Sequence, residues 1–444
     1  MNLAKKIGIA LLALMLFFGA WLTYTLLVPP KPLVQSKKTA LKNDSIVNLQ
    51  KEQDIRADSI LTLAESEFLA DSTFNTLMKS GEAGYIVQKK EYREISPKAK
   101  RINIAVIGVD ARLGTLSKRA DANHIISIVP DSGYIEIISI PRDTPADAGM
   151  KDSTQNKLTI VHSSRGLNTY LREAAKIAKV GPIPYWMELG FSQAMGIIQL
   201  LGHRDSKSTL QVLRSRKGLG GDDYQRCYNQ GQYIRQMILK HFHRADGIMG
   251  ELLIRGGLAL VQSNLTADNI KGLVYELNKV GFPKETNAIE VKVKPETGIR
   301  YKVYNFGDST TVKNLKSKIE DFNTFMSKKD SSYKKKSLNI AERLYKVLKL
   351  ASADTAKSPG KVVAKLEPYL QQHAWLQVFD EKQRDEIRTK FGEYLIISYY
   401  KLNKPEDARR VYETIQLEKQ LFLLDQKQAA QKSVQLPKNL PKSK

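Results

Sequence analysis

Residues 102–145, INIAVIGVDARLGTLSKRADANHIISIVPDSGYIEIISIPRDTP, decide the fold of this chain because they hold three apolar runs in close succession. The runs are Ile102–Val109, Ile125–Val129 and Ile135–Ile140. Continuous apolar runs of this length are typical of strands buried on both faces. The turn residues Asp131-Ser132-Gly133 between the second and third runs predict a hairpin. We therefore expect an α/β fold whose central sheet is mixed rather than wholly parallel.

Charged side chains adjoin each of these three runs. Asp110 follows the first run, Arg119 and Asp121 precede the second, and Arg142 and Asp143 follow the third. Open α/β sheets bind their ligands at strand ends. Carboxylates interleaved with guanidinium groups suit a metal ion that bridges phosphate oxygens, with arginines neutralising the remaining charge. Surface salt bridges are the alternative, and three such clusters within about 35 residues make a binding site the favoured hypothesis.

A second group of basic residues lies further along the chain. Arg214 and Arg216 are two residues apart, so in a strand they would project from the same face. Arg226 and Gln230 are four residues apart and share one face of a predicted helix over residues 223–243. Glycines precede this helix, and the start of a helix readily binds an anion. The pattern predicts a phosphate-binding role for this group.

The charge balance favours an anionic partner. The 444 residues carry a formal net charge of +24, which suits nucleic acid, anionic lipid headgroups or phosphorylated polymers. Cys227 is the only cysteine, which excludes an intramolecular disulfide and a cysteine zinc cluster.

The N-terminal segment narrows these classes. Residues 7–28 contain no charged side chain and are longer than a bilayer core requires. A cleaved signal peptide would have an apolar region of ~7–15 residues that ends in small residues. We therefore predict a single-pass anchor in the cell membrane within residues 1–30. A short basic start before an apolar run is the export pattern, so we expect the bulk of the chain on the extracytoplasmic side, where nucleic acid is not a partner.

The remaining sequence predicts four further parts. Residues 31–100 are expected to form a stalk and linker, and 101–327 an α/β catalytic domain with a helix over Ser192–Leu201 capped by Ser192 and short strands around 289–305. Residues 337–432 are predicted to be wholly helical, with Pro405 at a first helical position. At most one tetratricopeptide-like unit is visible there, so a plain helical bundle is an equal alternative. The tail at 433–444 is expected to be disordered.

At this point the chain resembles the LytR-CpsA-Psr family of membrane-anchored cell-wall glycopolymer transferases. The resemblance covers roughly residues 100–325. The matching segments, in order, are GVDAR, RAD, SIPRDT, KLTIVHSSRG, PIPYWMELGF, LRSRKG and DDYQR, followed by Gln230. Single motifs such as PRD are weak evidence, whereas the ordered set is strong. The resemblance implies a three-layer α/β/α domain.

The family's activity implies a transferase that takes a glycopolymer from a polyprenyl-pyrophosphate carrier and joins it through a phosphodiester to peptidoglycan. By motif, Asp110 and Asp121 correspond to ligands of Mg²⁺, with Mn²⁺ as the alternative ion. The implied pyrophosphate clamp is Arg119, Arg142, Arg214, Arg216 and Arg226, which Asp143 and Gln230 orient. Such chemistry needs positioning and charge neutralisation more than a protein nucleophile.

The chain departs from the family pattern at three positions. Asp222 replaces a usual glycine, Asn229 a second arginine, and Thr159 an asparagine. These departures leave the acceptor in doubt. Two other hypotheses stay open: a non-catalytic scaffold that binds lipid pyrophosphate while its C-terminal helices recruit a protein partner, and a pyrophosphatase that hydrolyses such lipids. The apolar side chains Phe191, Met195 and Ile198 could wall a groove for a polyprenyl chain, with core packing as the favoured alternative.

Overall fold

The computed structural model describes residues 99–434, except positions 116–117, 204, 217–218, 220–221, 246, 285–286, 298, 300, 330–338 and 356. The predicted membrane anchor, nearly all of the stalk, and the tail from residue 435 onward lie outside the described residues. Among the helices that are described, none has the length and apolar character needed to cross a bilayer.

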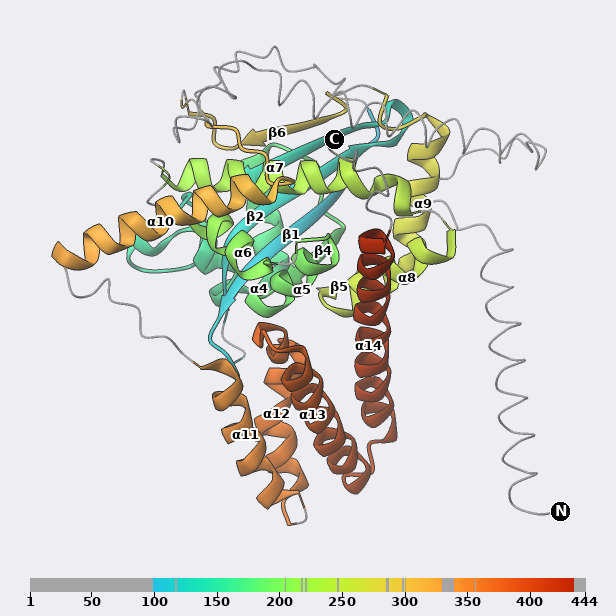
Figure 1. The fold of residues 1–444 in the computed structure, drawn as a ribbon. Coiled ribbons are helices and arrows are strands. Elements are labelled where there is room, and N and C mark those ends of the chain that lie inside the picture. Colours follow the sequence, from blue (N-terminus) through green and yellow to red (C-terminus); the bar gives the residue numbers. More distant parts are fainter. Residues whose placement is uncertain are drawn as a thin grey trace, which may run out of the picture.

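A six-stranded mixed sheet forms the centre of the α/β domain, as the apolar runs predict (Figure 1). Its strand order is β5-β4-β1-β2-β3-β6. The strands are β1 Ile102–Ala111, β2 Lys118–Val129, β3 Tyr134–Ile140, β4 Tyr185–Leu189, β5 Gln262–Ser263 and β6 Ile289–Val293. The three central strands pair antiparallel, whereas β4 runs parallel to β1 and β6 parallel to β3. The hairpin between β2 and β3 is confirmed, with Gly133 in the left-handed conformation at φ 61°.

Helices cover both faces of this sheet, because alternate residues of the central strands are apolar on each side. On one face, Ile107, Ile125 and Ile138 pack against α4 Leu158–Ala178. On the other face, Ile104 and Ile137 belong to a second core with α7 and α9. The elements outside the sheet in this domain are α5 Phe191–Leu200, α6 Ser206–Arg214, α7 Asp223–His241, α8 Gly247–Ala259, α9 Ala267–Lys279 and α10 Ser309–Lys329.

Two local predictions in this domain are wrong. Arg214 and Arg216 do not lie in a strand: Arg214 is the last residue of α6, and Arg216 follows in a bend. The helix forms because the Asp205 side chain accepts a hydrogen bond from the Ser208 amide at its start and because Leu210 and Leu213 bury one face. Ser192 is not a helix cap either. Gly190 precedes α5, and its amide donates to Gln193 Oε1 at 2.5 Å.

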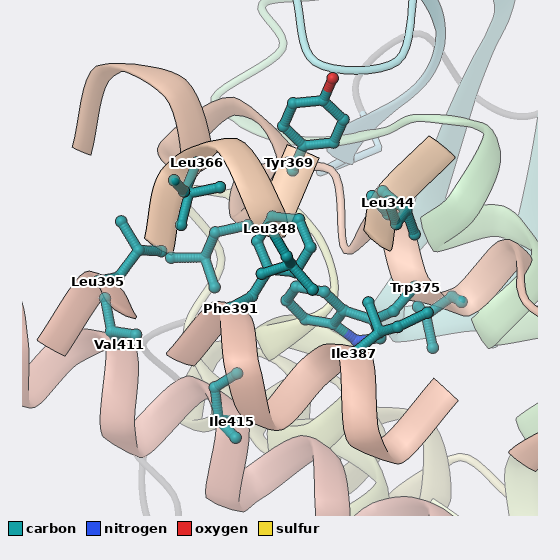
Figure 2. Packing of buried hydrophobic residues seen from close by; sticks show 14 of the residues in the cluster. Leu344, Leu348, Leu366, Tyr369, Trp375, Ile387, Phe391, Leu395, Val411 and Ile415 are labelled. Carbon is teal, nitrogen blue, oxygen red and sulfur yellow. The ribbon is translucent and has the colours of Figure 1, made fainter. Parts of the chain in front are cut away.

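The C-terminal residues are helical, as predicted. They form α11 Ile340–Asp354, α12 Pro359–Gln371, α13 Glu381–Lys401 and α14 Pro405–Val434, and Pro405 occupies the first position of its helix. Their core surrounds Trp375 and Phe391, both fully buried (Figure 2). The same core includes Leu260, which follows α8 of the α/β domain. The C-terminal helices, hereafter the helical module (residues 340–434), are therefore packed against the α/β domain.

A buried carboxylate fixes the inside of the helical module. Glu418 on α14 accepts hydrogen bonds from His373 Nδ1 at 2.7 Å, Trp375 Nε1 at 2.6 Å and Arg388 Nη1 at 3.1 Å. Its side chain has no exposed surface. Although burial opposes ionisation, these donors hold the pKa of Glu418 below its usual value. Glu418 therefore joins α14 to the segment between α12 and α13.

We expect Glu418→Ala to lower the free energy of unfolding by about 3–5 kcal/mol, because it removes the buried partner of Arg388 Nη1 and the acceptor of His373 Nδ1 and Trp375 Nε1. Urea unfolding followed by circular dichroism measures this change. Glu413→Ala is the matched control, since Glu413 lies on the same helix and its side chain is 59% exposed. Equal effects of the two substitutions would contradict the assignment.

Candidate functional site

An apolar cavity of about 400 Å³ opens beside the ends of β1 and β2. Its walls come from the sheet and from α5, α6 and α7. The apolar lining consists mainly of Val106, Ile126, Met187, Leu189, Phe191, Ala194, Ile197, Ile198, Leu201, Leu210, Leu213, Tyr233, Ile234, Met237 and Ile238. Phe191 and Ile198 were predicted to pack in the core or to wall a groove, and both line the cavity. Met195 is buried in the neighbouring core instead.

The polar lining of this cavity is small and charged. It consists of Asp110, Asp121, His124, Arg214, Arg226 and Gln230. Segments more than 100 residues apart in the sequence thus meet at one cavity. An apolar cavity with a few convergent charged groups is the usual form of a site for an amphipathic ligand.

A β-bulge in β2 lies at Asp121, which is one of the residues that line the cavity. Gly108 pairs with Ala122 and Val109 pairs with Ala120, so Asp121 is the extra residue of β2. Ala122 and His124 line the cavity by ordinary strand alternation. The bulge interrupts this alternation at Asp121, whose carboxylate contacts Arg142 and Thr159 at the start of α4. Arg119, two residues earlier, pairs across the strands with Asp110 and is exposed, and it is not among the described residues that line the cavity.

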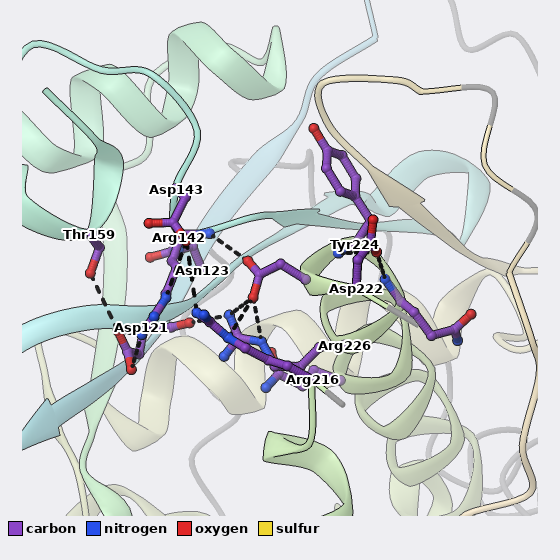
Figure 3. A network of polar contacts seen from close by, with 12 residues as sticks. Asp121, Asn123, Arg142, Asp143, Thr159, Arg216, Asp222, Tyr224 and Arg226 are labelled. Carbon is purple, nitrogen blue, oxygen red and sulfur yellow. Dashed lines mark hydrogen bonds and ion pairs between the residues drawn. The ribbon is translucent and has the colours of Figure 1, made fainter. Parts of the chain in front are cut away.

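Arg142 holds the carboxylate of Asp121. Its Nη1 lies 2.8 Å from Oδ1 and 2.9 Å from Oδ2 (Figure 3). Thr159, at the start of α4, donates to the same Oδ1 at 3.4 Å. Asp143 lies beside this pair, with Oδ2 3.6 Å from Arg142 Nε, and Oδ1 3.4 Å from Lys157 Nζ. Thr159, which replaces the asparagine usual in the family, therefore contacts Asp121, the predicted metal ligand.

Asp223 joins the two basic groups, and sequence reasoning missed it. Its Oδ1 accepts from Arg226 Nε at 2.9 Å and lies 3.0 Å from Arg216 Nε, while Oδ2 accepts from the Arg142 amide at 3.3 Å. Burial raises the pKa of this carboxyl against the opposing effect of the arginines. The i,i+3 spacing of Asp223 and Arg226 on one helix was the available signal.

The two remaining arginines at the cavity differ in exposure. The Arg226 side chain is 5% exposed, and its Nη2 donates to the Asp121 carbonyl at 3.0 Å. The Arg214 side chain is 48% exposed, stacks over Phe191 with Cζ 4.9 Å from the ring centroid, and lies 3.9 Å from Asp110. Arg226 is thus fixed, whereas Arg214 has room to turn toward a ligand.

Among the described residues, Gln230 forms no hydrogen bond to an arginine side chain. Its Oε1 lies 3.2 Å from His124 Nε2, and its Nε2 donates to the Leu213 carbonyl at 3.0 Å. Gln230 therefore links α7 to the end of α6 and to the cavity-lining histidine. It supports the turn that carries Arg214, one residue after Leu213.

The carboxylates at the cavity bear on whether it can hold a metal ion. Within the part of the chain that the structure describes, no three histidine, cysteine or acidic side chains gather as a metal cluster. Asp110 and Asp121 both line the cavity, and the Asp110 side chain is 61% exposed. Mg²⁺ is typically held by one or two carboxylates together with substrate phosphates. Two carboxylates beside arginines therefore fit a magnesium ion whose remaining ligands come from a phosphate substrate and water.

These features define an α/β domain with a charged, arginine-rich opening to an apolar cavity. The LytR_cpsA_psr family model matches residues 70–202, which confirms the resemblance to the LytR-CpsA-Psr family over this segment. Asp110, Asp121, Arg142 and Asp143 lie within the match, and the arginines after residue 202 lie beyond it.

Individual relatives are similar over parts of the chain. A polyisoprenyl-teichoic acid–peptidoglycan teichoic acid transferase, TagU from Bacillus cereus, is 25% identical over 119 residues, and the similarity covers 27% of this chain and 38% of TagU. The solved structure of TagV from B. subtilis is 16% identical, covers 50% of this chain and 97% of TagV, and gives a TM-score of 0.37. A structure of TagT bound to LI-WTA is 16% identical, with 52% and 93% covered and a TM-score of 0.33.

Burial of His124 predicts a pH dependence of stability. Burial is the main cause that lowers the pKa of His124 to about 4. Burial also lowers the pKa values of His203 and His241 to about 4. Below pH 6.5 the unfolded chain gains protons that the folded chain rejects until about pH 4, so stability should fall as the pH decreases through this window. Each histidine contributes a slope of at most ~1.4 kcal/mol per pH unit.

Urea unfolding midpoints between pH 7 and pH 4 measure this effect. We expect the unfolding free energy of His124→Gln to fall less steeply as the pH decreases, by the contribution of one histidine. An unchanged slope in this variant would show that His124 does not contribute.

Proposed function

We propose that this chain is a membrane-anchored phosphotransferase that moves a glycopolymer from a polyprenyl-pyrophosphate carrier to peptidoglycan and forms a phosphodiester. The observation that carries the proposal is a cavity whose lining is apolar over most of its surface and charged where Asp110, Asp121, Arg214 and Arg226 meet. An amphipathic lipid pyrophosphate matches both parts. The name of the relative TagU supports this class of donor and acceptor.

The basic groups give the site its preference for an anion. Arg119, Arg142, Lys157, Arg214, Arg216 and Arg226 outnumber the carboxylates Asp110, Asp121, Asp143 and Asp223. A pyrophosphate would offset this surplus. Arginine also binds phosphate through two parallel hydrogen bonds, which a lysine cannot do.

In the proposed reaction, the hydroxyl of a peptidoglycan sugar attacks the phosphorus that carries the glycan. A bond forms between this oxygen and phosphorus, the bond from phosphorus to the bridging oxygen breaks, and prenyl phosphate leaves while the hydroxyl proton passes to solvent. Arg214 and Arg226 would stabilise the charge that develops on the phosphate oxygens. Asp110 and Asp121 would hold Mg²⁺, which supplies further charge neutralisation when it is bound.

The predicted location belongs to the same proposal. The uncharged run at residues 7–28 would anchor the chain in the cell membrane, with the catalytic domain on the extracytoplasmic side. This arrangement brings the cavity to the surface that holds a lipid-linked substrate and faces the peptidoglycan acceptor.

The charged residues are tested by prenyl phosphate release from a polyprenyl-pyrophosphate-linked glycan, using the purified full chain in detergent with and without Mg²⁺. We expect Asp110→Ala and Arg142→Ala to lower the rate by about a hundredfold or more, because each removes preorganised charge at the pyrophosphate. Asp147→Ala and Arg165→Ala are matched controls, since these residues form an exposed ion pair with each other. Parent-like activity in the first two variants would refute the site, and release without transfer to added peptidoglycan would identify a pyrophosphatase.

The apolar cavity is tested separately. Ala194 lines it from α5, so Ala194→Phe should fill part of it and weaken binding of a long prenyl pyrophosphate by about tenfold, equivalent to ~1.4 kcal/mol. Binding of inorganic pyrophosphate should not change. Ala194→Ser is the control of similar volume. Isothermal titration calorimetry measures the binding of both ligands to the parent and to each variant. Equal loss for both ligands would show that the apolar cavity does not hold the lipid.

A further inference from the structure

The helical module contacts both sides of the proposed site, although it lies outside the segment that matches the family model. Residues Gln371–Gln377 contact the turn after β1 and the outer face of α5. We propose that Gln372 is a positioning residue, which fixes the turn at Arg112–Thr115 and thereby the Asp110 carboxylate. This inference rests on the proposed function for its chemical consequence.

Every polar atom of the Gln372 amide is used in this contact. Its Oε1 accepts from the Gly114 amide at 2.8 Å, and its Nε2 donates to the Thr115 carbonyl at 2.7 Å and the Arg112 carbonyl at 3.2 Å. Arg343 of α11 donates to the Leu113 carbonyl at 2.9 Å. The helical module therefore binds backbone groups of all four residues in the turn.

Side-chain packing at the turn is equally close. Gly114 has φ +77°, and a Cβ there would lie 2.3 Å from Tyr369 Cζ. A residue other than glycine would need both a strained backbone and displacement of this buried ring. The turn and the helical module are thus closely packed as well as hydrogen-bonded.

The position of Asp110 depends on this turn. Asp110 is the penultimate residue of β1, next to Ala111, and the turn begins at Arg112. The side chain itself is largely exposed, and its recorded ion pair with Arg214 is long at 3.9 Å. Because these side-chain contacts are weak, the position of the carboxylate depends on the backbone. Pairing with Arg119 of β2 holds the Asp110 backbone on one side, and Gln372 holds the turn that begins two residues after Asp110.

The helical module also supports the apolar wall of the cavity. Gln377 Nε2 donates to Ser192 Oγ at 2.8 Å, and Gln193 Nε2 donates to the Gln371 carbonyl at 3.1 Å. A Cβ at Gly196 would lie 2.8 Å from Leu376 Cδ1. Ser192, Gln193 and Gly196 lie on α5, and the other face of this helix lines the cavity. The helical module therefore braces the charged end and the apolar wall of one site.

The test compares the full chain with Gln372→Leu and Arg343→Met, which each remove hydrogen bonds to the turn while keeping an apolar stem. Gln371→Leu is the matched control, since that side chain bonds Glu367 inside the helical module. Hydrogen exchange of peptides covering residues 110–121 reports on the turn. Titration calorimetry with farnesyl pyrophosphate, with and without Mg²⁺, reports on the site, and thermal unfolding reports on global stability.

We expect faster exchange at the turn in both variants, a transition temperature like that of the control, and affinity for farnesyl pyrophosphate in Mg²⁺ lower by about tenfold, because small displacements of a positioned group are costly. Affinity measured without Mg²⁺ should change little, which separates displacement of Asp110 from general loosening. Unchanged affinity in Mg²⁺ despite faster exchange would overturn the proposal. The binding comparison does not require turnover, so absence of transferase activity in the parent would refute the proposed function without deciding this inference.

Discussion

Compensation of clustered guanidinium groups by carboxylates is the interaction on which the site depends. Buried charges are costly unless they are paired, and Arg226 is almost fully buried beside Arg142 and Arg216. Asp223 contacts all three, through two side chains and one backbone amide. Its negative charge thus offsets the repulsion among Arg142 at a strand end, Arg216 in a bend and Arg226 on a helix. The remaining positive surplus is available to an anionic ligand.

The sheet gives this cluster its geometry. The antiparallel β1–β2 pair brings Asp110 and Asp121 to the same end, where both line the cavity. Asp121 is the extra residue of β2 at this bulge, and its carboxylate contacts Arg142 and Thr159. Charge and apolar surface therefore meet where β1 ends and β2 begins.

The helical module adds a second level of organisation. Its core includes Leu260, which follows α8. Its segment Gln371–Gln377 forms hydrogen bonds with the turn after β1. The buried Glu418 holds that segment to α14 through His373 and Trp375. Rigidity in the helical module is consequently transmitted to backbone groups next to Asp110. A module remote in sequence becomes part of the support of the site.

The sequence by itself determined the three central strands, a short strand from residue 289, the hairpin, the helical C-terminal part and the identity of most charged residues in the cluster, because apolar runs and turn residues are local signals. Only the tertiary structure decided that Arg214 ends a helix, that Gln230 bonds His124 and the Leu213 carbonyl, and that Asp223 joins the arginines. It also decided that Gln372 holds a turn some 260 residues away. These outcomes depend on packing between distant segments, which leaves no periodic pattern in the chain.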